Sequence, residues 1–414
     1  MSDKNDPEYF EYEVKRAQQY FENSAGVSRR ALARIAAGGA AAVAMLANAR
    51  AANAVAENNL SDGSGIKLCS QGGVNPTDDE LKFNNEIGYK YIYSAAPRGA
   101  RMSVDDMLAA KKRYADAGIT LHSIRYLLGG KGGNDINTML LNQPGADQAL
   151  EDTKSWIRDT AKVGFDYTGS RLMITGVWED DMVDIRGGAM ERDFDPTSPK
   201  VHGSDYLGDT QPGTPRPAPG LNTLYWGREY GYDEVMANFK KYIAQGLGPV
   251  LEENKVFLAF HPDDPPVFKS LGGVARIMCN YERYKAMFAA ANSPYIGIQM
   301  CCGTWNEGGP LMGKDLVSVL KEFNGLKKYR EIHFRNISSP PVNGMPHFHE
   351  TFMDNGYYDM YKIMKTLVDI DFQGLVHLDH HPEMVGKEYA FLSYAAGFMH
   401  ACLVRAKNEP KGVL

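Results

Sequence analysis

The second half of the chain carries side chains of metal-binding types at regular intervals, each directly after an apolar run. The four residues are His261, Cys301, His333 and Asp379. Each interval has about the length of one strand plus one helix. Because parallel strands in a barrel present their carboxyl ends at one mouth, residues at equivalent strand ends converge there. The spacing therefore predicts that these four side chains meet.

Two imidazoles, a thiolate and a carboxylate form a mixed set of nitrogen, sulfur and oxygen ligands that suits a borderline divalent cation. Such a centre leaves positions open for two substrate oxygens. Taken singly, each residue has a plainer explanation, since a histidine at a strand end is often a packed polar residue and a buried cysteine often serves as a small hydrophobe. Four such residues at four consecutive strand ends favour a metal site.

The placement of these residues depends on an alternation of apolar runs and helical patterns that begins near residue 65. The expected strands are Ile66–Ser70, Tyr89–Ser94, Ile119–Arg125, Arg171–Val177, Val256–His261, Ile296–Cys301, Ile332–Asn336 and Leu375–Asp379. The expected helices are Asp78–Glu86, Val104–Ala117, Asp147–Val163, Asp233–Glu253, Val274–Ala291, Asp315–Phe323, Asp359–Asp369 and Glu388–Lys407. Eight such units predict an α/β fold, a closed parallel (β/α)8 TIM barrel. The pattern alone leaves an open doubly wound sheet as the alternative.

One connection, residues 178–231, is much longer than the others and dense in Gly, Pro, Asp and Trp. A connection of this length in a compact domain is usually a lid or a binding loop, and it follows a strand end, where barrel active sites form. Tyr225, Trp226, Arg186 and Glu179–Asp181 are candidates for facing a substrate, and a solvated decoration is the alternative. Residues 57–414 are thus expected to form one catalytic domain with this insertion.

The first 56 residues differ in character from the rest. Arg29 and Arg30 precede a weakly apolar run, Ile35–Leu46, and several Ala-x-Ala cleavage choices follow it. Paired arginines before such a run are typical of a twin-arginine signal, which predicts contact with that export machinery and a periplasmic location. The run is too short and too rich in Ala and Gly for a stable membrane anchor. An amphipathic helix retained by the mature protein is the alternative.

The overall composition favours a small-molecule substrate over a macromolecular partner. The net charge of −6 argues against binding to nucleic acid, which usually requires a basic face. The five cysteines are odd in number and irregular in spacing, so they do not indicate a disulfide framework. A thiolate bound to metal before export would be shielded from oxidation. The sequence leaves a homo-oligomer open.

Several segments of the chain form a recognisable series. They are FHPDDPP at 260–266, MCCGT at 300–304, IHFRN at 332–336, HFHE at 347–350, GYYDMYKIMKTL at 356–367 and LDHH at 378–381. This series resembles the mannonate dehydratase family of the xylose-isomerase-like superfamily, most clearly over about 257–380. The resemblance implies that His261, Cys301, His333 and Asp379 ligate a divalent metal. Mn²⁺ or Fe²⁺ suits a lyase with this ligand set better than zinc, which the chemistry does not exclude.

The resemblance further implies a lyase that dehydrates an aldonic acid such as D-mannonate to a 2-keto-3-deoxy acid. A metal that chelates the carboxylate and a neighbouring hydroxyl lowers the barrier to removing the α proton. His380 matches the family's catalytic histidine. Tyr389 is the nearest candidate for its catalytic tyrosine, although the loop is shorter here and Tyr389 is also placed to begin the final helix. Arg335 suits either a substrate oxyanion or a salt bridge at the barrel rim, and His349 suits a substrate contact near the lid.

Two other functions compete with this interpretation. A metal-dependent sugar isomerase or epimerase of the same superfamily would also move protons next to a carbonyl, but such enzymes rely more often on Glu, Asp and His ligands. Cys301 therefore favours the dehydratase. A non-catalytic sugar- or metal-binding protein would need no acid–base pair beside an open metal, which argues against it.

Replacement of Arg29 and Arg30 by Lys tests the export signal. We expect the variant to stay in the cytoplasm with its N-terminus uncleaved, because the export machinery reads the paired arginines. Cell fractionation and N-terminal sequencing of the wild-type and variant proteins measure this. Normal processing and export of the variant would contradict the twin-arginine interpretation.

Overall fold

The computed structural model describes residues 65–97, 101–125, 135–204 and 220–413. The predicted export segment, residues 1–56, lies outside the described residues. Within the described part, none of the helices combines the length and the apolar character that a membrane span requires.

Eight parallel strands form the centre of the fold. They are β1 (Ile66–Gln71), β2 (Tyr91–Ala95), β3 (Thr120–Arg125), β4 (Tyr167–Arg171), β9 (Phe257–His261), β12 (Ile296–Cys301), β13 (Tyr329–His333) and β16 (Gly374–His377). Their order is β3-β2-β1-β16-β13-β12-β9-β4, so the last strand of the chain pairs with the first. Thr168 of β4 donates a side-chain hydrogen bond to the carbonyl of Ile124 in β3 at 3.2 Å, which joins the two ends of this order. The predicted TIM barrel is confirmed, and the open doubly wound sheet is excluded.

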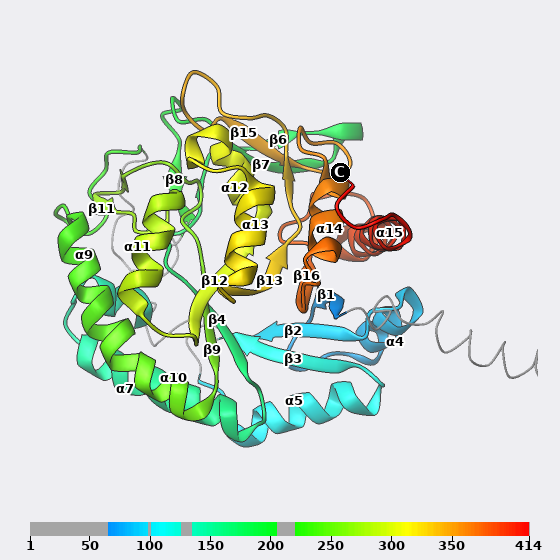
Figure 1. Cartoon of the computed structure of the whole chain (residues 1–414), viewed down its shortest axis with the longest axis horizontal. Helices are drawn as coiled ribbons and strands as arrows, with labels where there is room; N and C mark the ends of the chain where they lie inside the picture. The colour runs from blue at the N-terminus through cyan, green and yellow to red at the C-terminus, as the bar shows by residue number, and fades with distance from the viewer. Residues whose placement is uncertain (1–64, 98–100, 126–134, 205–219, 414) are drawn as a thin grey trace, which may run out of the picture. The chain divides into compact units, whose positions relative to one another are not determined.

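The helices pack on the outside of these strands (Figure 1). The longer ones are α4 (Asp78–Ile87), α5 (Val104–Asp116), α7 (Ala146–Lys162), α11 (Tyr281–Ala291), α13 (Leu316–Gly325), α14 (Met360–Asp369) and α15 (Lys387–Asn408). Short helices are α6 (Asp135–Leu140), α9 (Tyr232–Asn238), α10 (Gly248–Asn254) and α12 (Cys302–Gly308). A π-helical segment, Phe239–Leu247, joins α9 to α10, so the expected helix Asp233–Glu253 is one interrupted helical stretch. Capping boxes at Thr77 and Ser103 fix the starts of α4 and α5.

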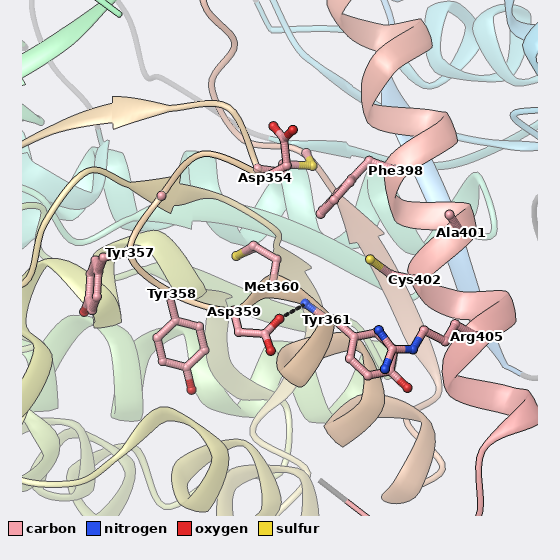
Figure 2. Close-up of a pocket in the computed structure, with 12 residues that line it drawn as sticks. Asp354, Tyr357, Tyr358, Asp359, Met360, Tyr361, Phe398, Ala401, Cys402 and Arg405 are labelled. Atoms are coloured by element: carbon pink, nitrogen blue, oxygen red, sulfur yellow. Dashed lines mark hydrogen bonds between the residues drawn. The ribbon is translucent and has the colours of Figure 1, made fainter. Parts of the chain in front are cut away.

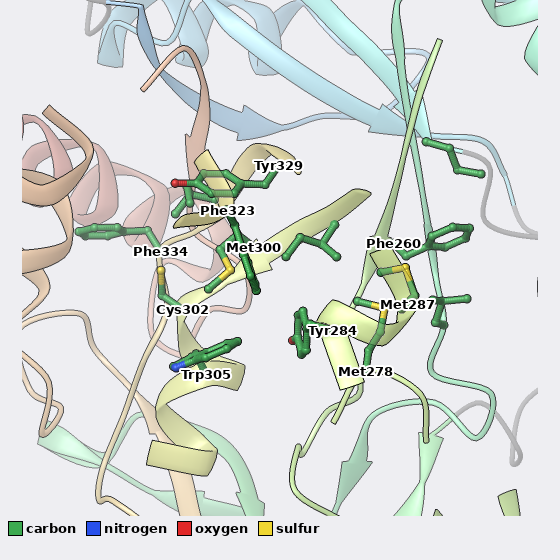
Figure 3. Close-up of a cluster of buried hydrophobic side chains, with 14 of the residues drawn as sticks. Phe260, Met278, Tyr284, Met287, Met300, Cys302, Trp305, Phe323, Tyr329 and Phe334 are labelled. Atoms are coloured by element: carbon green, nitrogen blue, oxygen red, sulfur yellow. The ribbon is translucent and has the colours of Figure 1, made fainter. Parts of the chain in front are cut away.

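A large apolar cluster fills the space between the strands and the helices. Figure 3 shows part of it, where Cys302, Trp305 and Phe334 lie beside Met300 and Tyr329. Cys302 is completely buried among these side chains. Cys301, one residue earlier, is the last residue of β12 and the N-cap of α12, so the two adjacent cysteines have different surroundings.

The predicted strand Arg171–Val177 is wrong, because β4 is Tyr167–Arg171. The apolar run that suggested a strand, Leu172–Ile174, is buried without pairing as a strand, and Leu172 and Ile174 belong to the core cluster. The strand in the structure carries the small and polar residues Thr168, Gly169 and Ser170. They are buried, and the side chain of Gln299 leaves little room beside Gly169 for anything larger. Tertiary burial thus overrides the local strand signal here.

The predicted helix Val274–Ala291 begins later than expected, at Tyr281. Val274–Ala275 forms a short strand, β11, that pairs with Ser270–Leu271 (β10). The side chain of Asn280 accepts a hydrogen bond from the backbone of Arg283 and thereby caps the start of α11.

The long connection 178–231 is an organised insertion within its described residues. It contributes β5 (Trp178–Glu179), β6 (Met182–Asp184), β7 (Met190–Phe194) and β8 (His202–Gly203). A four-stranded sheet in the order β14-β15-β7-β6 joins it to β14 (Asn336–Ile337) and β15 (Phe348–Thr351), which follow β13. Strands β6, β7 and β15 group together at the top of Figure 1. The insertion is therefore anchored to the chain that leaves the barrel mouth at His333.

Candidate metal centre and active site

The structure brings the four predicted ligands together at the barrel mouth. His261, Cys301 and His333 are the last residues of β9, β12 and β13, and Asp379 follows β16 by two residues. Their ligand atoms all lie within 4.8 Å of one another. The two histidines and the cysteine are buried, and the side chain of Asp379 is 12% exposed. Parallel pairing in the barrel produces this convergence, because it aligns the strand ends.

The lone pairs of this cluster fit a cation. Nδ1 of His333 is buried without a hydrogen-bond partner, although Oδ1 of Asp379 lies 3.1 Å away. Sγ of Cys301 lies 3.6 Å from Oδ2 of the same carboxylate. Nδ1 of His261 lies 2.9 Å from the carbonyl of Pro262, which leaves its Nε2 for the cluster. A bound divalent ion would satisfy these atoms together, so the residues present fit a metal.

The protonation of the ligands also suits a metal. Burial, with the neighbouring His333, lowers the pKa of His261 to about 3, so its imidazole is neutral at physiological pH. Burial raises the pKa of the Cys301 thiol, although Arg335 opposes this effect. Burial also opposes ionisation of Asp379, but His333, His380 and Arg335 hold its pKa well below the usual range. Metal binding therefore requires the release of a proton from Cys301.

A cavity of about 130 Å³ opens beside the cluster and includes three of its members. The same cavity is lined by His380, Arg125, Arg171 and Gln299. The last three were not predicted as site residues. Arg125 could have been suspected because it ends an expected strand, whereas only the structure shows that Arg171 ends β4. Gln299 lies inside β12, where only the tertiary structure reveals that it faces the cavity.

His380 is held beside the cluster by a buried carboxylate. Its Nδ1 lies 2.9 and 2.8 Å from the two carboxylate oxygens of Glu350. Burial would lower the pKa of His380, but Asp379 and Glu350 together raise it to about 9. The pKa of Glu350 is lowered to about 2 despite its burial, because Arg192 and Arg335 lie beside it. The ring is therefore protonated at neutral pH and is able to donate a proton into the cavity.

Arg335 lies behind the cluster, outside the residues that line the cavity. Its guanidinium contacts four carboxylates, at 2.8 Å from Asp264, 2.9 Å from Glu350 and 3.1 Å from Asp379, with Glu307 as the fourth. Of the two interpretations of Arg335, this geometry favours the salt bridge, because the carboxylates already occupy the guanidinium. Arg335 thereby holds Asp379 and Glu350 in place.

Arg192, from the insertion, joins the same buried network. It lies 3.1 Å from Asp264 and 2.5 Å from Glu350. Burial together with Asp264 raises the pKa of Glu307 well above its usual range. Asp264 and Glu350 each contact both Arg192 and Arg335, and these pairings reduce the cost of burying the two guanidinium groups.

His349 and Tyr389 lie away from the cavity. His349 pairs with Asp193 in the sheet of β15 and β7, and the adjacent Glu350 is the residue that reaches His380. Successive side chains of a strand point to opposite faces, which explains this one-residue difference. Tyr389 lies in the first turn of α15 with 44% exposure, and its ring contacts that of Phe83, with centroids 4.4 Å apart and planes tilted by 30°.

The candidate residues of the insertion contact other parts of the protein surface and core. Tyr225 is buried and stacks on Trp178, with ring centroids 5.1 Å apart. Arg186 forms an ion pair with Asp354 at 2.8 Å. None of the predicted candidates Glu179–Asp181, Arg186, Tyr225 and Trp226 is among the residues that line the cavity beside the cluster.

A larger cavity, about 550 Å³, lies between the start of α14 and α15 (Figure 2). Tyr361 and Arg405 face each other there, with the guanidinium 3.9 Å from the ring centroid. This cavity contains none of the four ligands. The smaller cavity at the barrel mouth is therefore the candidate active site, because it combines the metal ligands with His380.

The barrel is similar in fold to solved structures of a mannonate dehydratase and of a xylose isomerase domain protein. The solved mannonate dehydratase of Streptococcus suis serotype 2 has a similar fold, with a TM-score of 0.66 and 21% identity, over 85% of this chain and 97% of that one. A xylose isomerase domain protein of Planctomyces limnophilus gives a TM-score of 0.51 and 13% identity, over 83% and 99% of the two chains. At these identities the likeness concerns the fold.

Part of the sequence is similar to mannonate dehydratases. Residues 221–401 match the model of the D-mannonate dehydratase (UxuA) family. The mannonate dehydratase of Thermotoga petrophila is 34% identical over 141 residues, which are 34% of this chain and 37% of that protein. Mannonate dehydratase 2 of Halalkalibacterium halodurans is 27% identical over 324 residues, 74% of this chain and 88% of that protein. The alignment thus spans little more than a third of the Thermotoga relative. The four ligands and His380 all lie in the part of the chain that carries the D-mannonate dehydratase pattern.

Replacement of single cysteines and histidines tests the ligand set. We expect Cys301→Ala and His333→Ala to lose most of the bound divalent metal, because each removes a ligand. Cys302→Ala is the matched control and should retain its metal, since this thiol lies in the apolar cluster. Elemental analysis of the purified variants, with circular dichroism to check folding, measures the effect. Equal metal content in all three variants would contradict the assignment.

Proposed function

We propose that the protein is a metal-dependent hydro-lyase that removes water from an aldonic acid, D-mannonate being the first candidate, to give a 2-keto-3-deoxy acid. One observation carries the proposal. His261, His333 and Asp379 line a cavity together with His380, and the ligand atom of Cys301 lies within 4.8 Å of those of the three ligands. All five residues lie within the segment that matches the D-mannonate dehydratase family. The relatives named mannonate dehydratase support the same reaction.

The reaction removes a proton from the carbon next to the carboxylate and a hydroxyl group from the following carbon. The enol that remains converts to the 2-keto acid, and the proton and the hydroxyl leave as water. A divalent ion, for which we infer Mn²⁺ or Fe²⁺, would supply Lewis acidity that makes the α proton easier to remove. A substrate that carries a carboxylate and several hydroxyl groups suits the polar lining of this small cavity.

Other residues of the protein would donate a proton, bind the anionic substrate and position these groups. His380, held by Glu350, is placed to protonate the departing hydroxyl group. Arg171 lines the cavity and would offer positive charge to an anionic substrate. Arg335 holds both Asp379 and Glu350, so it couples the position of a ligand to the position of the proton donor.

The proposal for the location of the enzyme rests on the sequence. Arg29, Arg30 and the apolar run that follows them support export by the twin-arginine route to the periplasm. That route suits a protein whose buried thiol is part of a metal site, because the metal protects the thiolate when it is loaded before export.

A panel of aldonates tests the reaction directly. We expect the metal-loaded protein to release a 2-keto-3-deoxy acid from D-mannonate or another member of the panel, and a chelator to abolish this release. Mass spectrometry detects the loss of one water from the substrate. Isomerisation of an aldose or ketose with unchanged mass, together with failure on every aldonate, would instead favour the epimerase alternative.

Replacement of His380 by Asn tests the proton donor. We expect kcat to fall by about a hundred- to ten-thousand-fold, the usual contribution of a general acid or base. Metal content and substrate binding should remain, because His380 is not one of the four ligands. His381→Asn is the matched control, since this neighbouring residue is exposed and lies outside the active-site cavity. Equal activity of the two variants would exclude His380 as the proton donor.

A further inference from the structure

Glu331 is a completely buried carboxylate directly behind the metal cluster. It lies in β13, two residues before His333, so the two side chains point to the same face of the strand, toward the barrel interior. We propose that Glu331 is a positioning residue that holds His333 as the Nε2–H tautomer and thereby turns its Nδ1 toward the metal. This inference rests on the proposed metal site.

The contacts of His333 distinguish its two ring nitrogens. Nε2 lies 3.3 Å from Oε1 of Glu331, whereas Nδ1 lies 3.1 Å from Oδ1 of Asp379 and has no hydrogen-bond partner. A histidine ligand commonly donates its second N–H to a carboxylate, which fixes the tautomer and the ring orientation. If Glu331 accepts the proton of Nε2, the lone pair of Nδ1 is directed at the cluster.

Glu331 is itself held from several sides. Tyr167 donates a hydrogen bond to Oε2 at 2.5 Å, and Gln299 donates one to Oε1 at 3.3 Å. Arg125 forms an ion pair with the same carboxylate, and Nε2 of His377 lies 2.6 Å from Oε1. A carboxylate with this many partners has one orientation, so it transmits a fixed direction to His333.

The group of Glu331, His333 and His377 also has the spacing of metal ligands. Arg125 argues against a second ion there, because its guanidinium already contacts the carboxylate that would have to bind the cation. The two groups share His333, and one imidazole nitrogen faces each of them. The arrangement is therefore one metal site with a supporting carboxylate behind it.

His261, the second histidine of the cluster, faces the metal site with Nε2, whereas His333 faces it with Nδ1. Nδ1 of His261 lies 2.9 Å from the carbonyl of Pro262, so an N–H there leaves Nε2 for the metal. The rings of His261 and His333 are 4.9 Å apart between centroids and tilted by 44°. The two histidine ligands thus use opposite nitrogens, one fixed by a backbone carbonyl and the other by Glu331.

Metal titration of Glu331→Gln tests the role of the carboxylate. We expect the affinity for Mn²⁺ or Zn²⁺ to fall by about 10- to 100-fold, the usual effect of removing such a partner. Glu331→Asp, which keeps the charge, should recover part of the loss. Asp369→Asn is the matched control and should leave the metal affinity unchanged. It also removes a carboxylate charge, but one that pairs with the buried Lys365 of α14. Thermal unfolding of the metal-free proteins separates a metal effect from a loss of folding.

Nuclear magnetic resonance of the wild-type protein gives a test that needs no variant of Glu331. With ¹⁵N-labelled histidine and diamagnetic Zn²⁺, we expect His333 to retain its proton on Nε2 and His261 to retain its proton on Nδ1. Loss of each signal in His333→Gln and His261→Gln assigns them. A proton on Nδ1 of His333 would overturn the proposal.

The outcomes separate this inference from the proposed function. Wild-type metal affinity that is unchanged in Glu331→Gln overturns the role of Glu331 and leaves the metal site intact. Failure of the wild-type protein to bind any divalent metal overturns both. Metal binding with the expected tautomers, but without dehydration of any aldonate, supports Glu331 and contradicts the proposed reaction.

Discussion

The convergence of four parallel strand ends is the constraint on which the rest of this structure depends. It places two imidazoles, a thiol and a carboxylate within 4.8 Å of one another at a buried position. Without a cation, such a cluster buries polar atoms that lack partners, as Nδ1 of His333 does. Burying an unpaired polar atom costs about 1–3 kcal/mol. A bound ion would offset this cost, which links the barrel architecture to the proposed chemistry.

A buried network of ion pairs surrounds the predicted metal centre and holds the residues next to it. Arg192 belongs to the insertion, Asp264 follows β9, Arg335 follows β13 and Glu350 belongs to β15. Their ion pairs connect these segments behind Asp379 and His380. Removing one partner of such a buried pair typically costs about 3–5 kcal/mol, because the other charge is left unpaired. The network therefore fixes His380 relative to the predicted ligand Asp379.

The insertion has a structural connection to both sides of the site. Its strand β7 pairs with β15, and Met190 at its start exchanges two backbone hydrogen bonds with Glu383, at 3.0 and 2.8 Å. Glu383 lies in the loop that follows Asp379 and His380. The long connection predicted from the sequence is thus bonded to the segments on both sides of the site. Its residue Arg192 reaches the buried carboxylates, among them Glu350.

The sequence by itself determined the (β/α)8 fold and the residues that meet at the barrel mouth. Both follow from local information, because strand and helix periodicity place each ligand at the end of a strand and barrel closure aligns those ends. The position of β4 was missed, since Thr168, Gly169 and Ser170 carry no apolar strand signal while the buried run after them does. Only the tertiary structure decided that His349, predicted to contact substrate, lies away from the cavity while Glu350 supports His380. It also decided that Arg335 faces carboxylates and that Arg125 and Arg171 line the cavity. These outcomes depend on which segments distant in the chain pack together, and no local pattern encodes that pairing.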